Sequence, residues 1–126
     1  MILVDTNILV DFFNNPTKEY AKVFAEQDVA VCGIVQAELL HGAASEKQVS
    51  LIKDMFVGLK YIDMKADDWI SLGLFLLQLR KFGLKVPFPD AVISYLSLKE
   101  DCELWTRDKH FLLIKDKINE LRLFSL

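Results

Sequence analysis

Short apolar runs alternate along the chain with longer segments whose apolar residues recur every three or four positions. The short runs, typical of strands covered on both faces, occupy residues 2–4, 29–32 and 102–105, with weaker candidates at 61–62 and 121–124. Helical spacing marks residues 8–13, 20–24, 35–40, 49–56, 65–82 and 90–99. This alternation predicts an α/β fold, a three-layer α/β/α sandwich around a mostly parallel sheet of four to five strands.

Several residues indicate where these helices begin and end. Thr17 can cap a helix start, and Ser45 with Gln48 fits the S-x-x-Q capping box. Gly83 should end the helix predicted over residues 65–82, because glycine easily adopts the left-handed conformation that follows many last turns. Pro89 stands where proline best starts a helix. The chain has no internal repeat or linker, so residues 1–126 are expected to form a single domain.

Composition narrows the class of protein. Hydrophobic residues make up 52% and charged residues 26% of the chain, which is enough apolar material for a core. The longest mainly apolar run, residues 69–77, is too short to span a membrane, and no basic leader precedes Asp5, so we expect a cytoplasmic protein. Cys32 and Cys102 lack zinc-site spacing and are expected to be free buried thiols. The net charge of -3 offers no general attraction for nucleic acid.

Four acids stand at positions where a site would form. Asp5 and Asp108 directly follow predicted strands, and ligands of open α/β sheets bind outside the carboxyl ends of the strands. Asp90 lies in the first turn of its helix, where the helix dipole favours the ionised form. Glu38 interrupts an apolar stretch, and a carboxylate beside a core is usually paired or metal-bound. We therefore expect these four side chains to converge.

Clustered carboxylates without Cys or His ligands suit a hard cation such as Mg²⁺ or Mn²⁺. Such an ion favours phosphoryl transfer, because it neutralises phosphate charge and lowers the pKa of a bound water. Polar neighbours could orient the carboxylates; these are Thr6, Asn7 and Thr106. With two histidines, a site built on His41 or His110 is not expected.

Simpler interpretations exist for each of these residues. Taken alone, Asp5 could be a helix cap, Asp90 a favourable first-turn acid and Asp108 a turn residue. Other acids are expected to be solvated surface, namely Asp67, Asp68, Glu100, Asp101 and Glu103, while Asp11 fits either reading. Five basic residues flank the predicted pocket in sequence and could contact phosphates: Arg80, Lys81, Lys85, Arg107 and Lys109.

The chain resembles the PIN domain family, and within it the VapC-type toxins of toxin–antitoxin pairs. The resemblance rests on four motifs in order, ILVDTNILVD at residues 2–11, QAEL at 36–39, VPFPDAVI at 86–93 and WTRDKHF at 105–111. It implies a PIN fold and an Mg²⁺- or Mn²⁺-dependent endoribonuclease. The family's acidic residues are matched by Asp5, Glu38, Asp90 and Asp108, and its polar supporting positions by Thr6, Asn7 and Thr106.

The resemblance also implies partners. Similar proteins act on RNA, form homodimers and are inhibited by a VapB-type antitoxin whose tail occupies the acidic groove, so DNA would be contacted only through the antitoxin and no membrane is involved. The helices around Phe12, Phe13, Leu72 and Phe75 could carry such protein contacts, although burial in the core explains these residues equally well.

The resulting hypothesis is hydrolysis of RNA phosphodiester bonds by metal-activated water. The metal would be held by Asp5, Asp90 and Asp108, with Glu38 binding it directly or through water. One alternative is a metal-dependent phosphatase or phosphotransferase with Asp5 as nucleophile, although the haloacid-dehalogenase pattern needs a second Asp where this chain has Asn7. The other is a catalytically inactive PIN-like interaction module.

Overall fold

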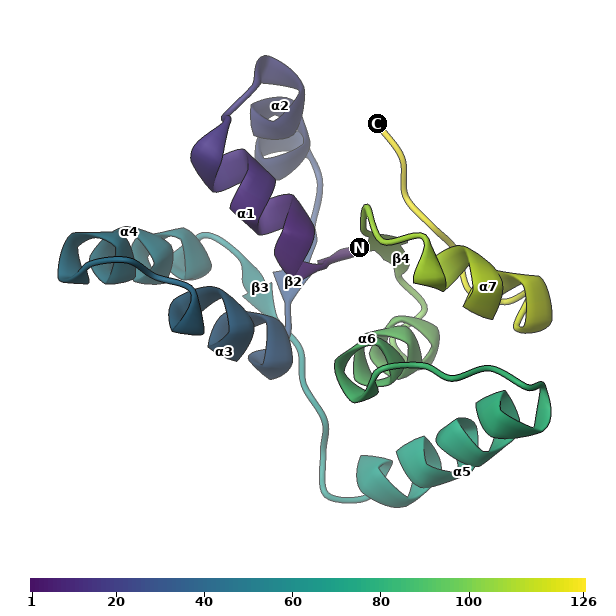
Figure 1. The fold of residues 1–126 in the computed structure, drawn as a ribbon. Helices are drawn as coiled ribbons and strands as arrows, with labels where there is room; N and C mark the ends of the chain where they lie inside the picture. The colour runs from purple at the N-terminus through teal and green to yellow at the C-terminus, as the bar shows by residue number, and fades with distance from the viewer.

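The computed structural model describes residues 1–126 and builds them around a small parallel sheet (Figure 1). The strands are β1 (Ile2–Val4), β2 (Val29–Val31), β3 (Lys60–Tyr61) and β4 (Glu103–Trp105), and they lie side by side in the order β3-β2-β1-β4. Every pairing is parallel, and Ile2 lies opposite Val29 on one side and Glu103 on the other. Strand β1 is therefore central, and Asp5 leaves its carboxyl end between β2 and β4.

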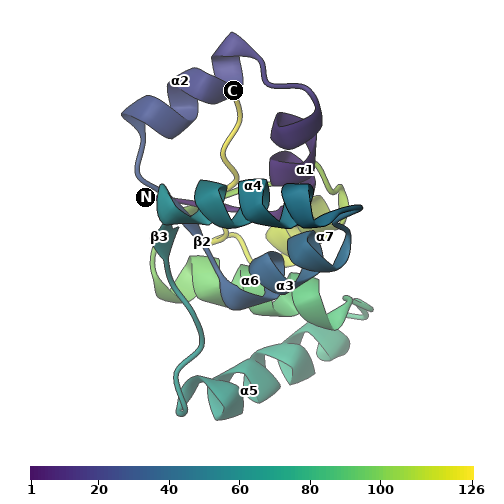
Figure 2. The same cartoon turned by 90° about the vertical axis from the view of Figure 1, so that its left-hand side faces the viewer.

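Seven helices cover the sheet. They are α1 (Thr6–Asn14), α2 (Lys18–Glu26), α3 (Gly33–His41), α4 (Glu46–Val57), α5 (Asp68–Lys81), α6 (Phe88–Lys99) and α7 (His110–Lys117). Helices α1 and α2 lie on the opposite side of the sheet from α5 and α6, and α6 lies between the strands and α5 (Figures 1 and 2). The predicted α/β/α layering with a parallel sheet is confirmed.

The predicted helix ends are also found. The Thr17 hydroxyl accepts a hydrogen bond from the Tyr20 amide at 3.3 Å, and Ser45 accepts one from Gln48 at 3.2 Å. Helix α5 ends in a Schellman motif, in which Gly83 has φ +80° and its amide donates to the Arg80 carbonyl at 2.9 Å. Helix α6 begins with Phe88, so Pro89 lies in its first turn.

Three predictions about local structure need correction. Helix α5 begins at Asp68 instead of residue 65, because the Asp68 carboxylate accepts the Lys65 amide and closes a turn there. The strand expected over residues 121–124 is a single parallel bridge between Leu104 and Leu123. Helix α7 was not predicted, although Phe111 and Ile114 are spaced for a helix and both are buried.

Asp68 is also wrongly assigned to the solvated surface. Only 6% of the residue is exposed, and its carboxylate pairs with Lys99 at 2.6 Å and accepts the Tyr95 hydroxyl at 2.8 Å. The hydrogen bond from Lys99, followed by that from the Lys65 amide, lowers the pKa of Asp68 to about 2. The ion pair ties the start of α5 to the end of α6 and has a structural role.

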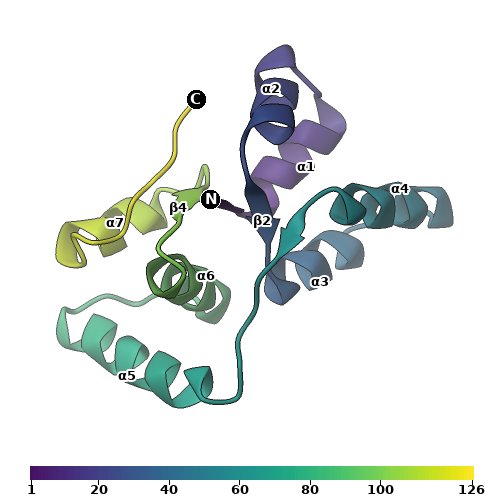
Figure 3. The same cartoon turned by 180° about the vertical axis from the view of Figure 1, so that it is seen from behind.

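Packing in the core accounts for the four apolar residues that the sequence left open as possible contacts with partner proteins. Leu72 and Phe75 are buried between α5 and the rest of the protein, and Phe12 and Phe13 pack against the core from α1. An aromatic group joins α1, α2, β4 and the C-terminal segment, which runs back past β4 (Figure 3). Its members are Phe12, Tyr20, Phe24, Trp105 and Phe124. Core packing therefore accounts for these side chains.

The two cysteines are free and buried, as expected. Burial raises the pKa of Cys32 to about 11, and burial likewise raises the pKa of Cys102, so both thiols stay protonated at neutral pH. No helix has the length and apolar character that crossing a bilayer requires.

Candidate functional site

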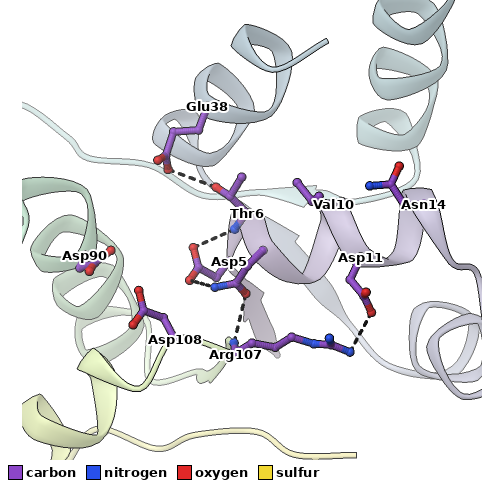
Figure 4. A pocket seen from close by; sticks show the side chains of 10 residues that line it. Asp5, Thr6, Val10, Asp11, Asn14, Glu38, Asp90, Arg107 and Asp108 are labelled. Atoms are coloured by element: carbon purple, nitrogen blue, oxygen red, sulfur yellow. Dashed lines mark hydrogen bonds and ion pairs between the residues drawn. The ribbon is translucent and has the colours of Figure 1, made fainter. Parts of the chain in front are cut away.

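The four singled-out acids converge on one cavity of about 500 Å³ (Figure 4). Asp5 comes from the end of β1, Glu38 from α3, Asp90 from the start of α6, and Asp108 from the loop between β4 and α7. Nine of the ten residues lining the cavity are polar or charged, and the exception is Val10. The parallel sheet brings Asp5 and Asp108 together because the strands that precede them end at one edge, and α3 and the start of α6 add Glu38 and Asp90 there.

Asp5 is the most constrained of the four. Its residue is 6% exposed, Oδ1 accepts the Thr6 amide at 2.7 Å, and Oδ2 accepts the Thr106 hydroxyl at 2.7 Å. Burial raises the pKa of Asp5, the hydrogen bonds from Thr106 and Thr6 oppose the rise, and the charges of Glu38 and Asp108 add to it. Asp5 therefore both caps α1 and presents a fixed carboxylate to the cavity.

Asn7 and Thr106 connect the ends of β1 and β4 beneath the acids. The Asn7 side-chain amide donates to Asp5 Oδ2 at 3.1 Å and to Thr106 Oγ1 at 3.3 Å, while its oxygen accepts the Arg107 amide at 3.1 Å. Thr106 Oγ1 also accepts the Asp108 amide at 3.0 Å. These bonds fix Asp5 relative to the Asp108 backbone, which is a supporting arrangement for the site.

Glu38 reaches the cavity for a different reason from the one the sequence suggested. It lies on the exposed side of α3, so the cost of burial does not explain its place in an apolar stretch. The Thr6 hydroxyl donates to Glu38 Oε1 at 3.1 Å and turns the carboxylate toward the cavity (Figure 4). Thr6 thereby links Glu38 to Asp5, because its hydroxyl donates to Glu38 and its backbone amide donates to Asp5.

Asp90 and Asp108 lie on the opposite side of the cavity from Glu38 (Figure 4). The Asp90 side chain is 15% exposed and that of Asp108 is 34% exposed. Burial raises the pKa of Asp90, the negative charges of Asp108 and Asp5 raise it further, and His110 lowers it. An acid whose environment opposes ionisation binds a cation readily, because the cation removes that penalty.

His110 belongs to this group, although no site that includes it was expected from the sequence. Its Nδ1 lies 3.2 Å from Asp108 Oδ1 and 3.6 Å from Asp90 Oδ2. One ligand atom from each of these three residues lies within 4.8 Å of the others. The spacing of His110, two residues after Asp108 at the start of α7, is a signal that could have found it once α7 was recognised.

The donor set fits a divalent cation. Of the five carboxylates that line the cavity, Asp11 pairs with Arg107, whereas none of the four singled-out acids forms an ion pair with Lys or Arg. His110 is the one basic side chain in contact with any of the four, and its side chain is 59% exposed. Oxygen-rich sites of this kind suit Mg²⁺ or Mn²⁺.

Of the five basic residues expected near the pocket, Arg107 alone lines it. Its guanidinium pairs with Asp11 Oδ2 at 2.7 Å and donates to the Tyr20 hydroxyl, which in turn contacts Asp11. Arg80 and Lys85 line a separate hollow beside the end of α5. Asp11, for which the sequence left both a site role and a surface role open, thus lies in the cavity and pairs with Arg107.

Known proteins similar to this chain match it over most of its length. The PIN domain family model matches residues 2–117. The Ribonuclease VapC1 of Methanocaldococcus jannaschii is 28% identical over 119 residues, which cover 91% of this chain and 82% of that protein.

Solved structures share the fold. The VapBC2 structure from Rickettsia felis, bound to a DNA fragment from its promoter, contains a chain that superposes with a TM-score of 0.79 at 26% identity, covering 98% of each chain. DNA-bound VapBC from Salmonella typhimurium superposes with a TM-score of 0.85 at 18% identity, covering 98% of this chain and 96% of that one. The second likeness, at its low identity, establishes the fold alone.

Proposed function

Because the chain belongs to the PIN domain family, we propose that it is a divalent-metal-dependent endoribonuclease and the toxin of a VapBC-type toxin–antitoxin pair. The observation that carries the proposal is the cavity in which Asp5, Glu38, Asp90 and Asp108 meet without a Lys or Arg partner. A structural network would pair these charges, since isolated carboxylates repel one another. The name of the relative from M. jannaschii, a ribonuclease, supports RNA as the substrate.

The site residues divide into those that would bind the ion and those that would keep these ligands in place. Asp5, Asp90 and Asp108 would hold Mg²⁺ or Mn²⁺, with Glu38 binding directly or through water. Such an ion neutralises phosphate charge and lowers the pKa of a bound water. Thr106 and Asn7 keep Asp5 Oδ2 in place, and Thr6 orients Glu38. The expected products carry a 5′-phosphate and a 3′-hydroxyl.

The decisive test compares cleavage of cellular RNA by the pure protein in Mg²⁺ or Mn²⁺, in EDTA, and after Asp90→Asn. Asp90 suits this test because its one side-chain partner is the exposed His110. Replacing Asp90 therefore breaks no buried hydrogen bond. Both treatments should reduce cleavage at least about 100-fold, since the ion and its ligand act together in the transition state. Undiminished cleavage in EDTA or by the variant would overturn the metal-dependent proposal.

Asp116→Asn provides a matched control. Asp116 lies on α7 with its side chain 76% exposed, and its nearest cation is Lys117 at 4.0 Å. The control removes the same charge without touching the cavity, so it should cleave RNA at the wild-type rate. Equal losses in the two variants would indicate an effect of net charge instead of a metal site.

The phosphotransferase alternative fits the geometry less well. The haloacid-dehalogenase pattern needs a second Asp two residues after the nucleophile, and here that position is Asn7, whose side-chain amide donates to Asp5 Oδ2 at 3.1 Å and cannot act as an acid. A phospho-enzyme trapping experiment separates the two reactions, because the ribonuclease forms no acyl phosphate on Asp5.

The partners follow from the same assignment. The solved relatives with VapBC in their names are complexes of toxin with antitoxin, some of them bound to DNA. We expect this chain to bind a VapB-type antitoxin, to reach DNA only through it and to form homodimers. Co-purification with the product of the neighbouring small reading frame, and loss of RNA cleavage on adding that product, test the antitoxin; light scattering tests the dimer.

A further inference from the structure

We propose that Arg107 binds a phosphate of the RNA next to the one being cut, and that Asp11 and Tyr20 hold the arginine in place for this contact. The inference rests on the proposed ribonuclease function and adds to it a residue that positions the substrate. It assigns a role to the end of the cavity farthest from Asp90, along α1 (Figure 4).

The charges lining the cavity make a cation necessary there. Five carboxylates line it, and Arg107 is the one basic residue among the ten lining residues. RNA is a polyanion, so a groove lined by acids repels every phosphate that no cation neutralises. A metal ion would serve the phosphate at the four acids, which leaves Arg107 for its neighbour.

The position of Arg107 fits a neighbouring phosphate. Its guanidinium is anchored at Asp11, six residues beyond Asp5 in the sequence and about 9 Å farther along the axis of α1. The helical rise separates the two backbones along the cavity, and Asp11 with Arg107 lies at the end away from Asp90, which places the guanidinium beside a neighbouring phosphate of a strand that follows the groove (Figure 4). Arg107 and Asp108 are also consecutive residues, so the loop that presents a site acid presents the phosphate contact as well.

The hydrogen bonds of Arg107 leave it able to bind a ligand. Both side-chain contacts use Nη2, one to Asp11 Oδ2 at 2.7 Å and one to the Tyr20 hydroxyl. Nη1 and Nε donate to no protein atom, and the side chain is 56% exposed. Tyr20 is 2% exposed and packed against Trp105, so the anchor is rigid. A preorganised guanidinium with free donors is well suited to a phosphate.

Arg122 offers a matched control on the other edge of the sheet. It pairs with Asp101 Oδ1 at 3.0 Å and its side chain is 52% exposed, so it resembles Arg107 in partner and exposure. Asp101 precedes β4, whereas Asp108 follows it, which places this pair away from the cavity. Arg122→Gln therefore removes the same charge from the protein without changing the groove.

The experiment measures binding of a fluorescent 12-nucleotide single-stranded RNA of mixed sequence in Ca²⁺, at several salt concentrations. Intactness of the RNA is checked on a denaturing gel, and thermal melting checks the folding of each variant. Arg107→Gln should weaken binding about tenfold at 0.1 M salt and lower the slope of log K against log salt by about 0.7, the value of one phosphate contact on a single strand. Arg107→Lys should keep the slope, because it keeps the charge, and Arg122→Gln should match the wild type.

The outcomes separate this inference from the proposed function. Equal slopes for wild type and Arg107→Gln, or equal losses for Arg107→Gln and Arg122→Gln, overturn the phosphate contact. Wild-type protein that binds RNA with the expected slope but fails to cut it overturns the ribonuclease and leaves the contact supported. A merely structural role for Arg107 would lower the melting temperature without changing the salt slope, and that result also overturns the inference.

Discussion

Asp90 shows how a single carboxyl can cost stability for the sake of ion binding. Its pKa is raised in the folded protein by burial and by the charges of Asp108 and Asp5, so the folded state binds its proton more tightly than the unfolded state does. Stability therefore falls as the pH rises from the ordinary pKa of 3.8 through the raised pKa of the folded protein, and the penalty is complete once the pH lies above that raised pKa.

Asp90→Asn should remove this penalty. In EDTA at pH 7.5 we expect the melting temperature to rise by about 2–4 °C, and the gain should shrink as the pH is lowered toward 4, because protonation of the wild-type carboxyl removes its repulsion. Thermal melts of both proteins across this pH range check it. Asp116→Asn, on the exposed side of α7, should show no comparable gain. A gain that is the same at pH 4 and pH 7.5 would contradict the repulsion argument.

Thr106 tests whether the polar residues beneath the acids support them. Its hydroxyl donates to Asp5 Oδ2 and accepts the Asp108 amide and the Asn7 side-chain amide, so Thr106→Val removes all three bonds at nearly constant volume. We expect RNA cleavage to fall at least about tenfold and stability to fall by about 1–2 kcal/mol. Thr106→Ser keeps the hydroxyl and should retain most of both. Cleavage rates and melts that do not distinguish valine from serine would contradict a role for these bonds.

At the scale of single residues, the sequence predicted which acids lie together in the cavity, but not the structural reason for each of them. Asp5 and Asp108 could be placed because each follows a strand, and strand ends share an edge. Glu38 was placed by an argument from burial, yet it is exposed and held by Thr6. His110 was missed because α7 was not predicted, although the spacing of Phe111 and Ile114 marks that helix and places His110 at its start, beside Asp90 and Asp108.

The end of α5 carries a prediction at the scale of an element. Gly83 has φ +80°, a conformation that costs a residue with a Cβ, so Gly83→Ala should destabilise the protein by about 1 kcal/mol. Gly73 lies exposed within the same helix, and a Cβ there would meet no atom within 4 Å. Gly73→Ala should therefore stabilise by up to about 1 kcal/mol, because alanine is the better helix former. Urea unfolding measures both, and changes of the same sign would contradict the assignment.

Elements with strong local signals could be predicted from the sequence, and those fixed by distant contacts could not. A few neighbouring residues determine the helix caps at Thr17 and Ser45 and the helix end at Gly83. The start of α5 is set by Asp68, whose carboxylate is held by Lys99 on another helix. The segment at residues 121–124 is apolar enough for a strand, but only Leu123 pairs with β4.

The distribution of charge is a property of the whole molecule. Five of the 18 acids and one of the 15 Lys and Arg line the cavity, so 13 acids remain against 14 basic residues and the rest of the protein is close to neutral. The net charge of -3 therefore comes from the acids of the cavity and not from an acidic surface elsewhere on the protein. A bound ion would change the local charge at the phosphate far more than the total suggests.

The same gathering of acids predicts how an ion should affect global stability. Asp5, Glu38, Asp90 and Asp108 come from segments that span most of the chain, so an ion bound among them holds those segments together and binds the folded state preferentially. At an Mn²⁺ concentration 100 times its dissociation constant, the free energy of unfolding should rise by about 2.7 kcal/mol. Thermal melts over an Mn²⁺ titration measure the gain.

Matched variants make this last prediction decisive. Asp90→Asn should remove most of the stabilisation by Mn²⁺ although it raises the melting temperature in EDTA, since the same charge both repels its neighbours and attracts the ion. Asp116→Asn should respond to Mn²⁺ as the wild type does. An interaction module without a metal site would show no dependence on Mn²⁺ in any of the three proteins, so a flat titration for the wild type would overturn the metal centre itself and not only the choice of ligands.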